Sequence, residues 1–137
     1  MENLYSHQAK AIARIREGSH VLVSTPTASG KSMIYNLSVL EEILKSPDSR
    51  ALYLFPLKAL AQDQLKTLSV FLERSGQEKS VRAAIYDGDT TPYRRKRIRK
   101  APPNILITNP DMLHRGILAY HEGWESFFQT LQFVVLD

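Results

Sequence analysis

The sequence predicts an α/β fold with a mostly parallel five-stranded sheet and helices on both faces. The first observation is a set of short apolar runs, at residues 21–24, 51–55, 81–86, 105–108 and 133–136. Apart from Arg82 these runs are nearly continuous in apolar residues, which is typical of parallel strands covered on both faces. The second observation is helical spacing of apolar residues in other stretches. The third is a loop of small residues that joins the first run to a helix.

In chain order, a helix at 6–17 precedes the first strand, and helices at 31–44 and 57–71 follow the first and second strands. Each helix is predicted from an apolar stripe on one side. The stripes are Ala9, Ile12 and Ala13, then Met33, Leu37, Leu40 and Leu44, then Leu60, Leu65, Leu68 and Phe71. A last group at helical spacing, Trp124, Phe127, Phe128 and Leu131, is expected to pack in the core under the final strand.

Glycine- and proline-containing breaks separate these elements, at residues 17–18, 46–48, 75–76, 87–89 and 101–104. Helices between parallel strands imply right-handed crossovers. In such sheets ligands bind at the carboxyl ends of the strands, so we expect the functional residues at that edge.

The loop after the first strand has the context of a phosphate-binding loop, because it ends in Gly-Lys-Ser and a helix follows. Its backbone N–H groups can surround a phosphate at the positive end of that helix. The lysine adds a charge and the serine hydroxyl can bind Mg²⁺. One departure from the usual pattern is a threonine at the position of the first glycine. The loop residues are Thr25, Pro26, Thr27, Ala28, Ser29, Gly30, Lys31 and Ser32.

Three other strand ends carry suggestive residues. Pro56 closes the second strand, and Asn109 and Pro110 begin a helix after the fourth. The fifth strand ends in Asp137. An acidic residue at a strand end is typical of a strand that presents a Mg²⁺-binding carboxylate beside a phosphate-binding loop.

The composition narrows the class of protein. The chain has 137 residues, no cysteine, four histidines and a net charge of +4. This length suits one core, and the residue content indicates neither disulfides nor a thiolate or histidine metal site. No apolar run reaches the roughly 18 residues of a membrane span, so we expect a soluble intracellular protein, cytoplasmic or in the nucleoid or nucleus. The mild basic excess suits a polyanionic partner.

Together these motifs resemble the first RecA-like domain of superfamily 2 helicases, the DEAD/DEAH-box group, over nearly the whole chain. Gln8 matches the adenine-reading glutamine, and residues 25–32 match motif I, in which alanine or threonine often replaces the first glycine. Residues 56–60 match motif Ia, residues 108–111 match motif Ib, and Asp137 matches the first residue of motif II. The variants of these motifs look most similar to RecQ-related DNA repair helicases of the YprA/Lhr type.

The resemblance implies an ATP-dependent helicase or translocase that acts on nucleic acid, single-stranded DNA more than RNA. Lys31 and Asp137 would serve catalysis, Ser32 and Asp137 would bind Mg²⁺, and Gln8 with the loop would bind ATP. The residues implied in nucleic-acid contacts are Pro56, Lys58, Ala59, Thr108, Asn109 and Asp111.

The sequence ends at the first residue of motif II. The glutamate that follows it in the family, motif III and a second RecA-like domain with its arginine finger are not in this sequence. We therefore expect residues 1–137 to be an ATP-binding fragment of a longer helicase, incomplete at its C-terminus and inactive alone, with the second domain as its partner.

Several alternatives stay open. The same strand, loop and helix occur in small P-loop kinases, RNA helicases share the motifs, and the chain alone could be a non-enzymatic binding module. Lys58 and Thr108 could be polar residues that flank helices. The basic run at 94–100 is more typical of a solvated helix face than of a DNA contact.

Overall fold

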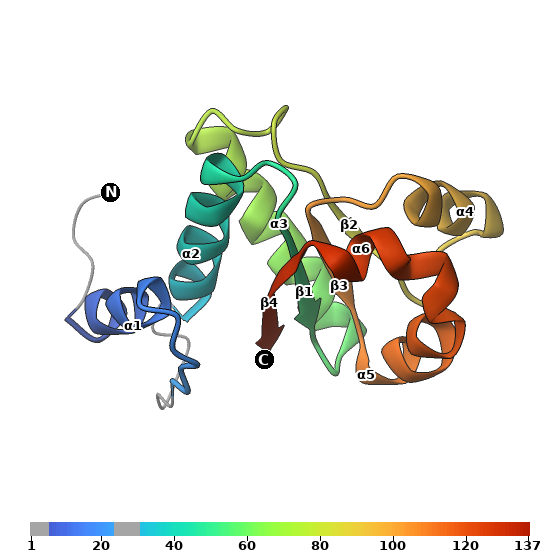
Figure 1. The fold of residues 1–137 in the computed structure, drawn as a ribbon, viewed down its shortest axis with the longest axis horizontal. Coiled ribbons are helices and arrows are strands. Elements are labelled where there is room, and N and C mark those ends of the chain that lie inside the picture. Colours follow the sequence, from blue (N-terminus) through green and yellow to red (C-terminus); the bar gives the residue numbers. More distant parts are fainter. Residues whose placement is uncertain (1–5, 24–30) are drawn as a thin grey trace.

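The computed structural model describes residues 6–23 and 31–137, without the side chains of residues 6 and 7. Its sheet has four parallel strands in the order β2-β3-β1-β4 (Figure 1). In register, Leu52 of β1 lies beside Leu106 of β3 and Val134 of β4. The strands are β1 (Arg50–Leu54), β2 (Ala83–Ile85), β3 (Ile105–Thr108) and β4 (Leu131–Leu136).

Helices surround the sheet in the predicted alternation. The α-helices are α1 (Ser6–Arg16), α2 (Lys31–Lys45), α3 (Lys58–Arg74), α4 (Pro92–Lys100), α5 (Pro110–Met112) and α6 (Glu125–Gln129). Between α5 and α6 the chain forms a π-helix, η1 (Leu113–Ile117), and a 3-10 helix, η2 (Leu118–Trp124). None of the helices in residues 6–23 and 31–137 has the length and apolar character that crossing a bilayer requires.

Two apolar cores lie on opposite faces of the sheet, because successive strand side chains point to opposite sides. On one face, Tyr53 and Ile107 pack with α2 and α3 through residues such as Val39 and Leu68. On the other face, Leu106 packs with residues of α4, η1, η2 and α6. The buried members of that second core are Leu52, Leu54, Tyr86, Ile98, Leu106, Ile117, Trp124 and Phe127.

The aromatic residues near the C-terminus are in the core, as predicted, but they pack with residues of β1 and β3 and, of the final strand β4, only with Leu131. Trp124 and Phe127 are fully buried, and Phe128 and Leu131 pack beside them. The Trp124 ring meets Tyr86 edge-to-face with centroids 4.9 Å apart, a geometry that aromatic pairs favour.

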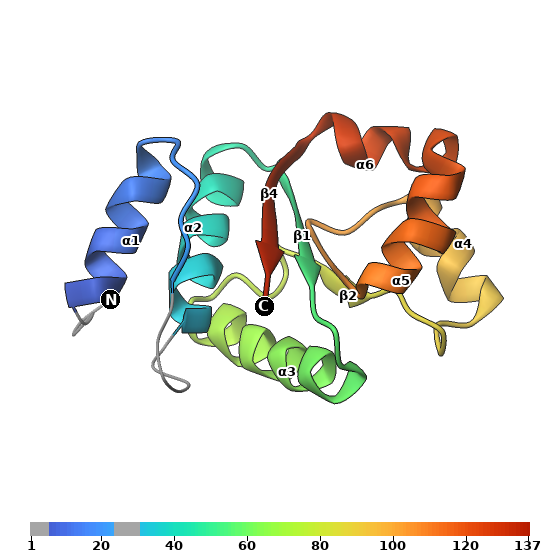
Figure 2. The same ribbon diagram turned by 90° about the horizontal axis from the view of Figure 1, so that it is seen from below.

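Helix α1 is attached to the rest of the molecule through α2. Ala11 and Ile12 pack on Ile34 in a small separate cluster. Arg16 makes a bidentate ion pair with Glu41, with nitrogen–oxygen distances of 2.9 and 2.7 Å. Figure 2 shows α1 beside α2, on the side away from the sheet.

The prediction of a first strand at residues 21–24 is wrong for its described part. Residues 21–23 have no regular secondary structure, and residue 24 lies outside the described residues. Leu22 is 95% exposed. A strand requires a neighbour to accept its hydrogen bonds, and none of the described strands lies beside this segment. The described sheet therefore has four strands instead of five.

The prediction of near-continuous burial is also wrong for β4. Its residues alternate between half-buried and exposed, and Val134 and Leu136 are 54% and 75% exposed. Phe133 and Val135 pack against the core under α2 and α3. The opposite face of β4 is not covered by any helix of the described chain, which leaves Val134 and Leu136 in solvent.

Candidate active site

The carboxyl ends of three neighbouring strands meet at one edge of the sheet. The Asp137 N–H donates to the Leu54 carbonyl at 3.1 Å, and the Phe55 N–H donates to the Thr108 carbonyl at 3.0 Å. Asp137, Phe55 and Asn109 thus follow strands that end side by side. This is the edge at which parallel α/β sheets hold ligands.

Lys31 and Asp137 come together at this edge. Lys31 is the first residue of α2, and its Nζ lies 3.9 Å from Asp137 Oδ1. The two side chains remain about a third exposed, at 35% and 27%. The start of a helix carries partial positive charge, so both Lys31 and the helix favour an anion here. Ser32 follows in the same first turn and is half-buried.

Tyr35 adds a contact that the sequence did not predict. Its hydroxyl lies 3.4 Å from Asp137 Oδ2 and 3.2 Å from Oε1 of Gln64 in α3. Burial first, and then the Asp137 charge, raise the pKa of Tyr35 above its ordinary value. The neutral phenol is therefore a donor that can orient the Asp137 carboxylate. Tyr35 lies one helical turn after Lys31, and this spacing could have predicted that its side chain is near the Lys31 site.

Gln8 lies in α1 and is only 4% exposed. The helix that carries it packs on α2, which begins at Lys31. The loop residues Thr25, Pro26, Thr27, Ala28, Ser29 and Gly30 lie outside the described residues.

Pro56, Lys58 and Ala59 are exposed at the start of α3, directly after β1. Lys58 forms an ion pair with Asp89, in the turn that follows β2. Both side chains are largely exposed, and pairs of this kind contribute little to stability. Asp89 was not predicted as part of the site, because only the folded chain brings it to Lys58.

The residues after β3 take part in local structure. Thr108 is 2% exposed, and its hydroxyl donates to the Tyr86 carbonyl at 2.6 Å. Asn109 caps α5 by accepting the Met112 N–H at 2.8 Å. Asp111 pairs with Arg115 at 3.2 Å. In this structure the Thr108 and Asn109 side chains support the local fold, whereas Asp111, like Lys58, forms an exposed ion pair.

The basic run forms α4, and most of its side chains are exposed, as predicted for a solvated face. Two arginines have additional structural contacts. Arg95 donates to the Asp87 carbonyl at 2.8 Å, and Arg99 donates to the Tyr86 hydroxyl at 3.0 Å. These bonds hold α4 against the turn after β2.

Within residues 6–23 and 31–137, no three histidine, cysteine, aspartate or glutamate side chains are close enough to hold a metal ion. The Asp137 carboxylate is an oxygen ligand at this edge, and Ser32, next to Lys31 in the first turn of α2, carries a hydroxyl. These are the hard oxygen ligands that Mg²⁺ accepts, with water and phosphate oxygens completing its shell. The residues present therefore fit Mg²⁺ bound together with a phosphate ligand.

Comparison with known families decides the class of protein. The DEAD/DEAH box helicase family matches residues 5–137, which is nearly the whole chain. The chain belongs to the DEAD/DEAH box helicase family. This membership confirms the resemblance found in the motifs and favours it over a small P-loop kinase.

Two curated relatives of this family member are each 46% identical to it. One is the uncharacterized ATP-dependent helicase YprA of Bacillus subtilis, matched over the whole chain and 18% of the relative. The other is the ATP-dependent helicase HRQ1 of Saccharomyces cerevisiae, matched over 99% of the chain and 12% of the relative. The chain thus spans less than a fifth of the length of these relatives.

A solved structure shows the same fold. The helicase MrfA bound to DNA and AMPPNP superposes with a TM-score of 0.91 and is 47% identical, over 98% of this chain and 18% of that one. This similarity confirms the RecA-like α/β fold.

Proposed function

We propose that this chain is the ATP-binding part of an ATP-dependent DNA helicase or translocase. The observation that carries the proposal is the ion pair of Lys31 and Asp137, 3.9 Å apart at the carboxyl edge of the sheet. A lysine at a helix start and a carboxylate at a strand end are the two charged groups that a Mg²⁺–nucleotide site requires. Membership of the DEAD/DEAH box helicase family supports ATP as the nucleotide.

In this proposal residues 25–32 surround the phosphates and Gln8 contacts the adenine. Lys31 neutralises phosphate charge, and Ser32 and Asp137 hold Mg²⁺. When bound, Mg²⁺ would offset the negative charge that develops on the phosphates during phosphoryl transfer. Tyr35 keeps the Asp137 carboxylate oriented toward this site through its hydroxyl.

Nucleic acid would lie across the ends of β1 and β3, near Pro56, Lys58, Ala59, Thr108, Asn109 and Asp111. The exposed Lys58 would contact phosphate directly. Thr108 and Asn109 would hold the protein backbone at the end of β3 in place for such contacts. Contacts to phosphate carry no sequence information, so low sequence preference and steep salt dependence are expected. DNA is favoured over RNA because the similar MrfA helicase has been solved with DNA. Competition between matched DNA and RNA strands decides between them.

Hydrolysis in this class requires a base that activates water and an arginine from a second domain. The motif matches assign neither role to a residue of this sequence. We therefore expect residues 1–137 to bind nucleotide and to turn it over only as part of a longer protein with a second RecA-like domain.

Calorimetric titration with Mg²⁺ and ATP tests the nucleotide site. Lys31→Ala removes a charge-assisted phosphate contact and should weaken ATP binding by roughly tenfold or more, since such bonds contribute about 1.5–3 kcal/mol. Lys45→Ala is the matched control, because Lys45 is exposed at the other end of the same helix. ATP should also bind more tightly than GTP. Equal affinity of Lys31→Ala and the unmodified chain would contradict the proposal.

A further inference from the structure

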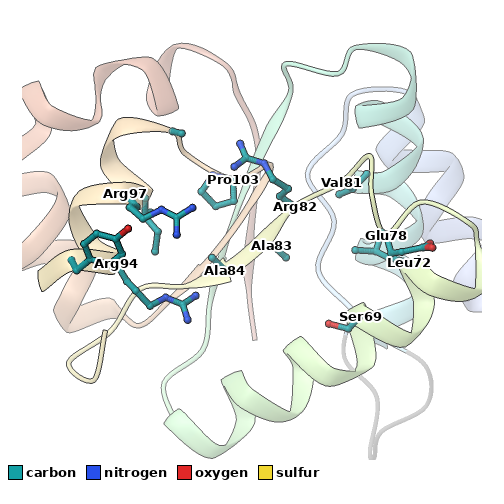
Figure 3. Close-up of a pocket in the computed structure, with 13 residues that line it drawn as sticks. Ser69, Leu72, Glu78, Val81, Arg82, Ala83, Ala84, Arg94, Arg97 and Pro103 are labelled. Carbon is teal, nitrogen blue, oxygen red and sulfur yellow. The ribbon is translucent and has the colours of Figure 1, made fainter. Parts of the chain in front are cut away.

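A groove of about 750 Å³ lies far from the candidate active site along the sheet. It runs over β2, between the C-terminal half of α3 and the helix α4 (Figure 3). Arg82, Ala101 and Pro103 line it, and these residues precede β2 and β3 in the chain. The groove is therefore at the amino ends of the strands, whereas Lys31 and Asp137 are at the carboxyl ends.

The floor of the groove includes an unpaired strand edge. Strand β2 is the last in the sheet order, with β3 on one side only. The Arg82 carbonyl and the Tyr86 N–H form hydrogen bonds to β3. Because the backbone groups of successive residues point to opposite sides of a strand, the N–H and C=O of Ala84 also point toward β3, and those of Ala83 and Ile85 point outward. The Ile85 carbonyl accepts from the Thr90 hydroxyl at 3.2 Å. The N–H and C=O of Ala83 have no strand beside them in the described part of the chain.

The groove is also basic on one side. Arg94 and Arg97 extend from α4 toward β2, and Arg82 extends from the start of the strand (Figure 3). Glu78 is the acidic residue among the lining side chains. None of these three arginines has a carboxylate partner among the described residues. The centroid of the exposed Tyr93 ring lies 5.8 Å from the Arg97 guanidinium, within the range of a cation–π contact.

We propose that this groove binds an extended, acidic peptide segment of a protein partner, which adds a strand to the outer edge of β2. The segment's backbone would pair with the N–H and C=O of Ala83, and its carboxylates would contact Arg94 and Arg97. An edge strand flanked by helices is a recurrent site for such strand addition. Guanidinium groups bind carboxylates through two parallel hydrogen bonds, which adds specificity.

A peptide fits this groove better than nucleic acid does. The Ala83 carbonyl requires a hydrogen-bond donor, which a peptide backbone supplies and a phosphodiester backbone does not. Leu72, Val81 and Ala84 make part of the lining apolar, which suits alternate side chains of a strand. The inference is independent of the proposed helicase function, because it uses no residue of the nucleotide edge.

Fluorescence anisotropy tests the proposal with a labelled eight-residue peptide of alternating valine and glutamate. The double variant Arg94→Glu and Arg97→Glu should weaken its binding by about tenfold or more. The matched control is Lys96→Glu with Lys100→Glu, which makes the same charge change on the same helix outside the groove. This control should retain affinity to within about threefold, since only long-range attraction changes. Circular dichroism verifies that both variants remain folded.

Two further measurements separate strand addition from simple charge attraction. A peptide with N-methyl groups along its backbone should bind much more weakly, and the peptide should slow hydrogen exchange at the Ala83 amide. The proposal is overturned if the peptide does not bind, if both double variants lose affinity equally, or if the N-methylated peptide binds as well. It is also overturned if single-stranded oligo-dT displaces the peptide and depends on the same two arginines.

Discussion

At the residue scale, Tyr35 connects the candidate metal ligand to a neighbouring helix. Its hydroxyl is within 3.4 Å of Asp137 and 3.2 Å of Gln64, and its ring packs edge-to-face on Tyr53 with centroids 5.1 Å apart. Gln64 belongs to α3, the helix that begins at Lys58. The hydroxyl therefore lies between the nucleotide edge and the helix proposed to contact nucleic acid.

Removing that hydroxyl should affect Mg²⁺-dependent nucleotide binding. Tyr35→Phe keeps the ring and its packing, so we expect the fold to remain and ATP affinity in Mg²⁺ to fall about fivefold, as for one net hydrogen bond of about 1 kcal/mol. Affinity measured in EDTA should change little, because Asp137 acts through the metal. Tyr93→Phe is the control, since Tyr93 is exposed on α4. An equal loss with and without Mg²⁺ would instead indicate a purely structural role.

The buried tyrosines also predict a stability loss in alkali. Burial raises the pKa of Tyr35 and of Tyr53 above the ordinary value of 10.0. Above that pH the unfolded chain releases these protons while the folded chain keeps them, so the free energy of unfolding should decrease as pH rises past about 10. Below pH 10 both states are protonated and the effect is absent. Urea titrations at several pH values above 10 give the free energy of unfolding of the unmodified chain and of Tyr35→Phe. This free energy should decrease less steeply with pH in the variant. The same pH dependence in both proteins would show that Tyr35 does not cause the loss of stability.

The contacts of the site show what residue patterns can and cannot predict. Lys31 and Asp137 were predicted together because Lys31 follows a predicted strand and Asp137 ends another, and parallel strands end at a common edge. Residues 21–23 form no strand, so the described chain places Lys31 at this edge as the first residue of α2. Tyr35 and Asp89 were missed because their partners, Asp137 and Lys58, are distant in the sequence. Sequence spacing places each residue on its own helix, strand or turn, and only the folded chain brings it to its partner.

At the element scale, strand predictions were correct where both faces are covered. β1 and β3 lie between two cores, and their continuous apolar runs are within one residue of the predicted bounds. Residues 21–23 have a similar composition but no strand neighbour among the described residues, so they do not form a strand. Apolar composition therefore predicts burial potential, and hydrogen-bonded pairing decides whether a strand forms.

Helix α1 illustrates how one element can be tested separately. It is fixed by Ala11 and Ile12 on Ile34 and by the Arg16–Glu41 ion pair. Arg16 lowers the pKa of Glu41 through its hydrogen bond, so this contact is lost when acid protonates the carboxylate. Gln8 is carried on the same helix, so its position depends on this packing.

Weakening that packing should lower the preference for adenine. Ile12→Ala removes a buried side chain, which typically costs about 2–5 kcal/mol, and α1 has few other attachments. We expect faster hydrogen exchange in α1 and a smaller ATP-to-GTP affinity ratio, with the sheet unchanged. Arg14→Ala, at an exposed position of the same helix, should leave both unchanged. Faster exchange with an unaltered affinity ratio would show that Gln8 does not read the base.

At the scale of the whole molecule, the two faces of the sheet are covered unequally at β4. Val134 and Leu136 lie in register with Leu52 and Leu54, on the same face. Leu52 and Leu54 are buried, whereas Val134 and Leu136 are largely exposed. β4 also has only β1 as a strand neighbour in the described chain. An exposed apolar strand with a free edge promotes association between chains.

We therefore expect residues 1–137 to self-associate in a concentration-dependent way through β4. Replacing Val134 and Leu136 with lysine places charges on the uncovered face and should reduce association, because charged edge residues oppose pairing. Light scattering over a concentration series should show a smaller average mass for the double variant. Val70→Lys is the control, because Val70 is an exposed apolar residue on α3 and not on β4. If that control reduces the mass as much as the β4 variant does, association depends on net charge and not on this strand.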